Sequence, residues 1–308
     1  MDMSAFLFPG QGSQSVGMLS ELAEVYPTVS EIFAQASEVL GFDLFALVSQ
    51  GPEDKLNQTA YTQPAMLTAA YAVWSVWCAE GGTKPVFMAG HSLGEYTAYV
   101  CAESISFEQA VKLVATRGEL MQAAVPAGEG AMAAILGLEN ELLAELCQQG
   151  AEQEVVEPVN FNAPGQTVIA GNVAAVERVL ELASAKGAKR AIKLPVSVPS
   201  HCALMKPAAE KLAAHLSEVT INPPKIPIIN NVDVKIYEDP EAIRDSLVRQ
   251  LHSPVRWVNI VNRLAAEGVT ECVECGPGKV LAGLVKRIDK SLSATPIFDS
   301  ASLAKALG

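Results

Sequence analysis

The sequence has few basic side chains and no long hydrophobic run, and both features limit the classes of function that it can have. It has 22 Lys and Arg against 34 Asp and Glu, which gives a formal charge of −12. This excess of negative charge argues against a nucleic acid or an anionic membrane surface as the main partner. The longest mostly apolar stretch, residues 65–79, is too short to span a bilayer and is typical of a core helix.

Cysteine is also scarce, and no secretory signal accompanies it. Residues 1–4 contain no basic region that leads into an apolar segment. Six cysteines in 308 residues, without such a signal, indicate reduced thiols. We therefore expect a cytoplasmic protein.

Motifs for metals and nucleotides are missing or incomplete. Cys272 and Cys275 form a single C-x-x-C, and no second pair completes a zinc site. The Gly-Lys pair at 278–279 lacks the upstream glycine and the following Ser or Thr of a phosphate loop. The glycines within residues 10–12 begin a dinucleotide fingerprint that Ser15 interrupts. We therefore expect no metal and no permanently bound cofactor.

A G-x-S-x-G motif stands out in a chain that is half hydrophobic. Residues 86–89 predict a short buried strand, and residues 95–102 predict a helix. Between them, Gly90 and Gly94 provide room for a sharp turn that exposes the hydroxyl of Ser92 at a helix N-terminus. This arrangement indicates a nucleophile, and the alternative is a glycine-rich packing turn.

Strands alternate with helices along the rest of the chain, which predicts an α/β fold with a mostly parallel sheet covered on both faces. The expected strands of this sheet are 5–8, 86–89, 226–230, 270–275 and 294–298. The expected helices cover 17–80 with breaks, 95–102, 107–122, 204–217, 240–251, 256–267 and 279–289. A β-α-β-β-α-β unit, which is the ferredoxin-like order, interrupts them at 131–136, 139–148, 155–161, 166–171, 173–186 and 188–195.

A serine nucleophile needs a base, and the sequence has only four histidines. His201 is our first choice, because it lies in a proline-rich loop where the two expected units join. His91 and His252 remain open, whereas His215 lies on an amphipathic helix and is the weakest candidate. No Asp or Glu occurs in a motif that marks it as the third member of a triad, so a backbone carbonyl is a possible orienting group.

Arg117 interrupts the apolar face of the helix expected at 107–122. The aliphatic part of its side chain is long enough for the guanidinium to reach solvent. Alternatively, its guanidinium points into a cleft and holds an anion. The residues alone leave both interpretations open.

Several motifs together resemble the malonyl-CoA:acyl-carrier-protein transacylases of bacterial type II fatty-acid synthesis. They are Phe-Pro-Gly-Gln-Gly-Ser-Gln at 8–14, Thr-Gln-Pro-Ala at 62–65, Gly-His-Ser-Leu-Gly-Glu at 90–95, Arg-Gly at 117–118 and Val-Pro-Ser-His at 198–201. The resemblance implies an α/β-hydrolase-like core over 1–125 and 198–308, and a ferredoxin-like subdomain over 126–197. It places the active site in the cleft between them.

The resemblance also implies roles for particular residues. Ser92 would be acylated, His201 would be its base, and the main-chain carbonyl of Gln250 would orient His201. The N–H groups of Gln11 and Leu93 would form the oxyanion hole. Arg117 would bind the malonyl carboxylate, and further substrate contacts would come from Gln63, Met121, Asn160, Asn162, Gln166 and Ser200.

The partners implied by the resemblance are malonyl-CoA and acyl carrier protein. We also expect the chain to act as a monomer. The carrier is acidic, so docking needs a local basic patch, which we expect at Lys186, Lys189, Arg190 and Lys193. A second basic group, at 286–290, and an ordinary solvated surface are the alternatives. Two rival functions are an esterase or thioesterase with the same turn and a catalytically silent domain that binds acyl carriers.

Overall fold

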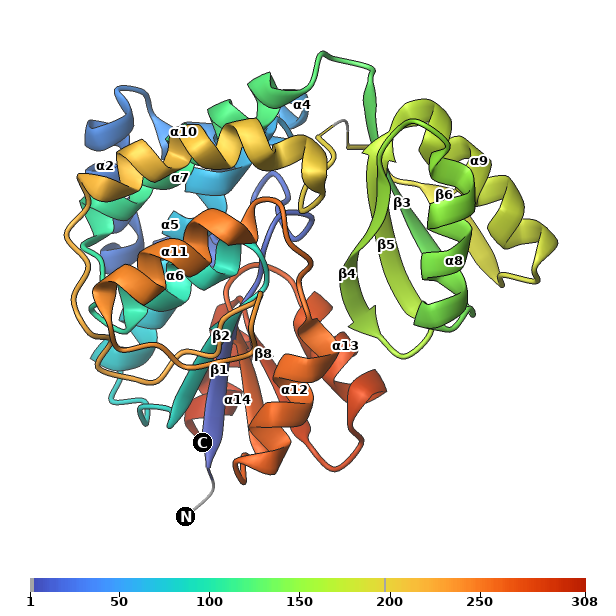
Figure 1. The fold of residues 1–308 in the computed structure, drawn as a ribbon. Helices are drawn as coiled ribbons and strands as arrows, with labels where there is room; N and C mark the ends of the chain where they lie inside the picture. Colours follow the sequence, from blue (N-terminus) through green and yellow to red (C-terminus); the bar gives the residue numbers. More distant parts are fainter. Residues whose placement is uncertain (1–2, 197) are drawn as a thin grey trace.

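The computed structural model describes residues 3–196 and 198–308, which form a mixed α/β fold with two separate sheets (Figure 1). The first sheet is parallel and four-stranded, in the order β2 (Phe87–Gly90), β1 (Ser4–Phe8), β7 (Glu271–Cys275) and β8 (Ser293–Ile297). The second is antiparallel, in the order β4 (Val156–Ala163), β5 (Gln166–Asn172), β3 (Gly130–Leu136) and β6 (Arg190–Lys193). This confirms the expected α/β class.

The central strand β1 explains why the parallel sheet is buried on both faces. Successive side chains of a strand point to opposite faces, and all of those from Ala5 to Phe8 are apolar and fully buried. Phe6 and Phe8 pack in one core cluster with helices of the N-terminal half. Ala5 and Leu7 pack in another, with side chains of α12 (Trp257–Ala266) and α13 (Val280–Ile288).

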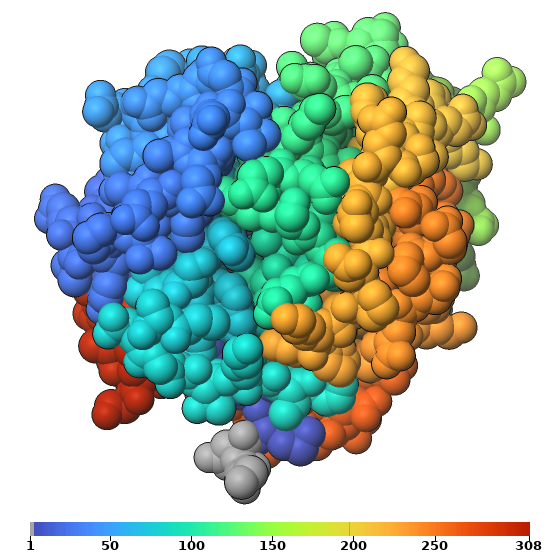
Figure 2. Space-filling model, turned by 90° about the vertical axis from the view of Figure 1, so that its left-hand side faces the viewer, coloured from blue at the N-terminus to red at the C-terminus, as the bar shows by residue number. Residues whose placement is uncertain are grey.

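Helices of the part that contains the parallel sheet cover the face on which Phe6 and Phe8 lie. The stretch expected as helices with breaks forms α1 (Ser20–Val25), α2 (Pro27–Leu40), α3 (Leu44–Gln50), α4 (Glu53–Leu56) and α5 (Thr59–Ala79). It is followed by α6 (Leu93–Cys101) and α7 (Phe107–Ala124), and later by a short 3₁₀ helix (Ala203–Met205), α10 (Lys206–Ser217) and α11 (Pro240–Gln250). In Figure 2, the segments near α2 (blue), α7 (green) and α10 (yellow) pack against one another on this face.

The antiparallel sheet carries α8 (Asn140–Ala151) and α9 (Val173–Ala185), which pack on one of its faces (Figure 1). The element order over these residues is β-α-β-β-α-β, as expected. The expected boundary at residue 197 lies outside the described residues.

Two expectations of the sequence differ from the structure. The strand expected at 226–230 is wrong, because among residues 3–196 and 198–308 this segment forms only isolated bridges, which pair Ile228 with Met88 and Ile229 with Ile236. Pro227 has no N–H, so a regular ladder cannot continue through it. The C-terminal helix α14 (Ser300–Leu307) was not expected, and Asp299 caps it by accepting a hydrogen bond from the Ser302 N–H at 2.7 Å.

Among the described residues, no single helix combines the length and the hydropathy that crossing a membrane requires. The pair formed by α2 and α3, bent by 119°, meets that test of length and composition only when its helices are taken together.

Candidate active site

The turn between β2 and α6 holds Ser92 in a strained conformation. Its φ of 52° and ψ of −110° lie in a region that non-glycine residues rarely occupy. A Cβ on Gly90 would lie 1.9 Å from the backbone carbon of Gly94, and a Cβ on Gly94 would lie 2.0 Å from the Phe8 oxygen. The two glycines therefore let strand, turn and helix approach closely enough to expose Ser92.

His201 is the histidine that reaches Ser92. Its Nε2 lies 2.8 Å from the Ser92 Oγ, and its Nδ1 lies 2.7 Å from the main-chain oxygen of Gln250. A carbonyl oxygen can only accept, so Nδ1 carries the proton and Nε2 is left to accept from the hydroxyl. His201 is itself held in the left-handed region, with φ 67°, and its N–H donates to the Leu251 oxygen at 2.9 Å.

The surroundings of His201 keep its ring neutral. Burial lowers its pKa to about 3, and the charge of Arg117 adds to the effect. An imidazole that is neutral at neutral pH is ready to take a proton from the hydroxyl.

The guanidinium of Arg117 is buried and points at Ser92. Its Nη2 donates to the Ser92 Oγ at 3.3 Å, and the residue is 1% exposed. The interpretation in which the charge reaches water is therefore wrong. The same Nη2 donates to the Gln250 Oε1 at 3.0 Å, and Nη1 donates to the Gln63 Oε1 at 2.7 Å.

No carboxylate is hydrogen-bonded to this buried cation among the described residues, and its Nε has no hydrogen-bond partner there. Burial lowers the pKa of Arg117. The guanidinium also lies over the Tyr96 ring, 5.2 Å from its centroid. A buried cation whose hydrogen bonds go only to neutral amides and a hydroxyl favours an anion brought by a ligand.

A cavity of about 510 Å³ opens over Ser92 and lies between the two sheet-containing units. One wall belongs to the parallel-sheet unit and includes Gln11, Gln63, Ser92, Leu93, Arg117, Met121 and His201. The opposite wall comes from the antiparallel unit and its return segment and includes Met132, Asn160, Leu194, Pro195 and Val196. The polar groups therefore converge on one wall and face a largely apolar one.

Two residues expected to donate backbone N–H groups to an oxyanion line the cavity near Ser92. Leu93 is the first residue of α6, so its N–H has no acceptor within the helix and lies at the positive end of the helix dipole. Gln11 lies in the loop that follows β1, and both residues line the cavity. Their place in the cavity wall is compatible with an oxyanion hole, which stays a prediction.

Not every expected substrate contact lines the cavity. Gln63, Met121, Asn160 and Ser200 do. Of the described residues, Asn162 and Gln166 do not line it: the Asn162 Oδ1 lies 2.8 Å from the His91 Nε2, and Gln166 accepts from Arg287.

The other histidines have different places. The Nε2 of His91 is hydrogen-bonded to Asn162, and His91 also lines the cavity next to Ser92. His252 is half-buried and His215 is exposed, and neither is hydrogen-bonded to Ser92 in the described part of the chain.

Sequence reasoning missed two residues behind the nucleophile. The Glu95 Oε2 accepts from the Gln250 Nε2 at 2.8 Å and from the Asn231 N–H at 3.0 Å, and burial raises the pKa of Glu95 to about 7. The amide of Asn231 accepts from the Ser92 N–H at 2.8 Å and donates to the Gly90 oxygen at 2.6 Å. A signal existed for Asn231, because a polar Asn-Asn pair follows the apolar residues 226–229.

The fold and this site define an acyl transferase, and residues 5–304 match the family model described as acyl transferase domain. The chain is 58% identical to the malonyl CoA-acyl carrier protein transacylase of Salmonella typhimurium over 307 residues, which is 100% of this chain and 99% of that protein. It is 57% identical to the Escherichia coli K12 protein of the same name, with the same coverage. The chain belongs to the malonyl CoA-acyl carrier protein transacylase family.

Solved structures agree with this assignment. An acyl carrier protein S-malonyltransferase from Vibrio cholerae has a TM-score of 0.96 and 59% identity, covering 98% of this chain and 99% of that one. A malonyl-transacylase in complex with AntF, a type II PKS acyl-carrier protein in its holo form, has a TM-score of 0.98 and 56% identity, with 99% of each chain covered.

Proposed function

We propose that this enzyme moves a malonyl group from malonyl-CoA to the phosphopantetheine thiol of acyl carrier protein, through a malonyl ester on Ser92, and so supplies fatty-acid synthesis. The observation that carries the proposal is the buried guanidinium of Arg117, 3.3 Å from the Ser92 Oγ. A planar fork of N–H donors matches a carboxylate, which malonyl has and acetyl lacks.

In the first half-reaction, the Ser92 Oγ attacks the thioester carbonyl while its proton passes to the His201 Nε2. The negative oxygen that develops receives hydrogen bonds from the N–H groups of Gln11 and Leu93, each contributing about 3–4 kcal/mol in the transition state. The carbon–sulfur bond then breaks, and coenzyme A leaves with the proton from His201.

In the second half-reaction, the carrier's thiol gives its proton to His201 and attacks the malonyl ester. The thioester forms, and the Ser92 Oγ recovers its proton when the ester bond breaks. The Gln250 carbonyl, 2.7 Å from the His201 Nδ1, keeps the ring in the tautomer that both half-reactions need. No cofactor takes part in either step.

The carrier is proposed to dock on Lys186, Lys189, Arg190 and Lys193. All four are exposed, and β6 leads directly into Leu194 and the following residues of the cavity wall. Each basic group has one member with a partner: Lys193 is paired with Glu177 at 3.1 Å, and Arg287 is hydrogen-bonded to Gln166. The direct continuity of β6 with the cavity wall favours the first group as the docking surface.

We further propose the division into an α/β-hydrolase-like domain over 1–125 and 198–308 and a ferredoxin-like subdomain over 126–197. The strand order β4-β5-β3-β6 supports the second part, because the first and third strands of the unit lie in the middle. Six free cysteines support the cytoplasm as the place of action. The monomeric state stays a prediction, which sedimentation equilibrium measures.

Intact-mass measurement after mixing with malonyl-CoA tests the proposal. We expect one malonyl group on the wild-type chain, located at Ser92 by peptide mapping, and none on Ser92→Ala. The adduct should persist in buffer and disappear when holo carrier protein is added. Rapid loss in buffer alone would favour a hydrolase, and no adduct at all would favour a silent carrier-binding domain.

A further inference from the structure

The loop over residues 230–236, which we call the Asn231 loop, is a strained turn behind the active site. Val234 is β-branched and has a φ of 56°, a conformation that such residues avoid. The Lys235 oxygen accepts from both the N–H and the Nδ2 of Asn230, at 3.0 and 2.7 Å, and the Asp233 N–H donates to the Asn230 Oδ1 at 2.7 Å. Internal hydrogen bonds therefore fix the shape of the loop.

The inner side of the Asn231 loop holds the nucleophile's turn. Asn231 is fully buried and bonds to Ser92, Gly90 and Glu95 at once. The Glu95 carboxylate in turn accepts from Gln250, whose carbonyl meets His201. The position of this loop is thus transmitted to both members of the Ser92–His201 pair.

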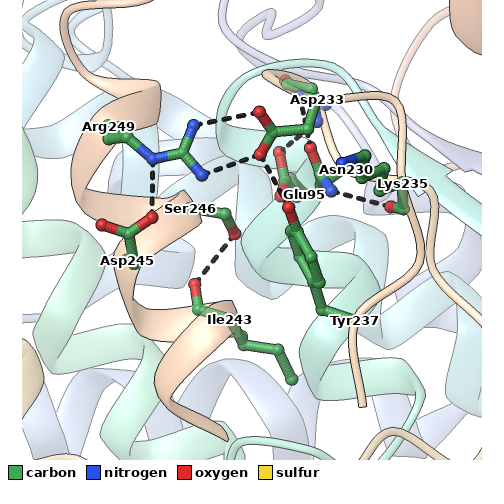
Figure 3. Close-up of polar contacts among 10 residues, drawn as sticks. Glu95, Asn230, Asp233, Lys235, Tyr237, Ile243, Asp245, Ser246 and Arg249 are labelled. Atoms are coloured by element: carbon green, nitrogen blue, oxygen red, sulfur yellow. Dashed lines mark hydrogen bonds and ion pairs between the residues drawn. The ribbon is translucent and has the colours of Figure 1, made fainter. Parts of the chain in front are cut away.

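The outer side of the loop is fastened to α11 by an ion pair (Figure 3). The Arg249 guanidinium donates to the Asp233 carboxylate twice, at 3.1 and 2.7 Å, and also to Asp245 at 2.6 Å. The Tyr237 hydroxyl donates to the same Asp233 carboxylate at 3.1 Å. Arg249 directly precedes Gln250, so the ion pair connects the loop to the helix end that orients His201.

We propose that Asp233 and Arg249 are positioning residues, whose ion pair locks the Asn231 loop against α11 and so keeps Ser92 aligned with His201. The inference rests on the proposed function only in taking these two residues as the reacting pair. Asp233 and Arg249 touch neither the cavity nor Ser92, and they act through Asn231 and Gln250.

A positioning role and a purely structural role of the Asp233–Arg249 pair predict different effects on reaction rate and on folding stability. The side chains of Arg249 and Asp233 are 32% and 25% exposed, so solvent screens the pair, although its two hydrogen bonds make it stronger than a single-contact surface pair. A small displacement of a nucleophile from its base, in contrast, reduces the rate strongly. Breaking the pair should therefore slow the chemistry more than it destabilises the fold.

The test is Asp233→Asn, which keeps the shape of the side chain and removes its charge. Its matched control is Glu154→Gln, which breaks the Arg178–Glu154 pair of the antiparallel unit, 2.7 Å long and 30% and 38% exposed. Both variants are compared with wild type for thermal unfolding and for single-turnover acylation of Ser92 by malonyl-CoA. A second reagent, phenylmethylsulfonyl fluoride, reports on the hydroxyl without a malonyl group: the Oγ–sulfur bond forms, fluoride leaves, and His201 takes the proton.

For Asp233→Asn we expect the rate constants with both reagents to fall about tenfold, with little change in half-saturation by malonyl-CoA. Asp233→Glu should recover part of the loss. The acid limb of the pH profile should move upward, because a loosened site admits water to His201, whose charged or titratable neighbours are Arg117 and His91. Glu154→Gln should leave both rates and the profile unchanged.

Rates and a pH profile for Asp233→Asn equal to those of the control would overturn the inference. So would a loss of rate that only parallels a loss of folded protein in the unfolding scans. If malonyl-CoA fails to acylate the wild type, the proposed function fails instead, and the sulfonyl fluoride rates still decide the role of Asp233.

Discussion

Arg117 is a cation buried against the hydroxyl of Ser92, and we propose that it determines which acyl group the enzyme accepts. The guanidinium is hydrogen-bonded to two amides, and no anion of the described residues is hydrogen-bonded to it. A malonyl carboxylate would complete it, whereas an acetyl group would leave it unpaired at a cost of about 3–5 kcal/mol.

Arg117→Ala tests this selectivity. We expect acylation of Ser92 by malonyl-CoA to fall by about two to three orders of magnitude, while acylation by acetyl-CoA is retained or gained. The measurement is the rate of adduct formation with each thioester, followed by mass. Equal losses for the two acyl groups would show that the residue serves the fold or the nucleophile and does not recognise the carboxylate.

The pH dependence of acylation follows from the buried imidazole. A pKa lowered to about 3 leaves His201 neutral throughout the neutral and mildly acidic range. We expect the acylation rate constant to stay level from about pH 8 down to about pH 5, whereas an unperturbed histidine would give half the rate near pH 6.5. Stopped-flow acylation at constant ionic strength measures the profile, and a midpoint near 6.5 would contradict the burial argument.

At the level of single residues, the sequence was most informative where the residues that shape a site are adjacent in the chain. Ser92 could be predicted because the glycines that shape its turn are its neighbours. The roles assigned to Gln250 and Gln11 depended on the family resemblance. The roles of Asn231 and Glu95 were missed, since their hydrogen bonds join segments more than 100 positions apart, which periodicity does not reveal.

At the level of elements, the turn between β2 and α6 depends on the absence of a side chain at Gly94. Gly94→Ala would place a carbon 2.0 Å from the Phe8 oxygen, so β1 or α6 must shift. We expect a loss of more than about 3 kcal/mol in unfolding free energy, or no soluble protein. Urea unfolding and soluble yield measure the effect.

Gly283→Ala is the matched control for this substitution. Gly283 lies within α13, and apart from its chain neighbours and the backbone of its own helix, no heavy atom of the described residues lies within 4 Å of the position its Cβ would take. We expect a gain of about 0.5–1 kcal/mol, because alanine is the better helix former. A loss of stability in this variant, or a tolerated Gly94→Ala, would contradict the packing described for the two positions.

Elements with a strong apolar period were predicted well, and those shaped by tertiary contacts were not. The residues of β1 and of the antiparallel unit were recognised from their own patterns. Residues 226–230 look like a strand because they are apolar, but the proline at 227 limits them to isolated bridges. The helix α14 was missed because it has little apolar pattern: Leu303 is the side chain that it buries.

At the level of the whole molecule, a net charge of −12 makes the location of positive charge decisive for an acidic partner. The double charge reversal Lys189→Glu with Arg190→Glu should lower kcat/KM for the carrier half-reaction about tenfold or more at low salt. Acylation of Ser92 by malonyl-CoA should be unaffected. Single-turnover transfer to holo carrier protein measures the first effect.

Lys211→Glu is the control for this prediction, because Lys211 is exposed on α10 and belongs to neither basic group. It should leave both half-reactions unchanged. If the double reversal behaves like this control, the docking surface lies elsewhere, and the second basic group becomes the one to test.

The position of β6 at the end of its sheet has a further consequence for solution behaviour. An end strand presents an unpaired backbone edge, on which another chain can add a strand and start aggregation. Ile192, 44% exposed, would favour such contact, but Arg190 and Lys193 lie on either side of it, and their like charges repel an identical edge. Substitutions that only neutralise Arg190 and Lys193 would remove this repulsion, so such variants would aggregate when the protein is concentrated. Charge-reversed variants would keep the repulsion and remain soluble.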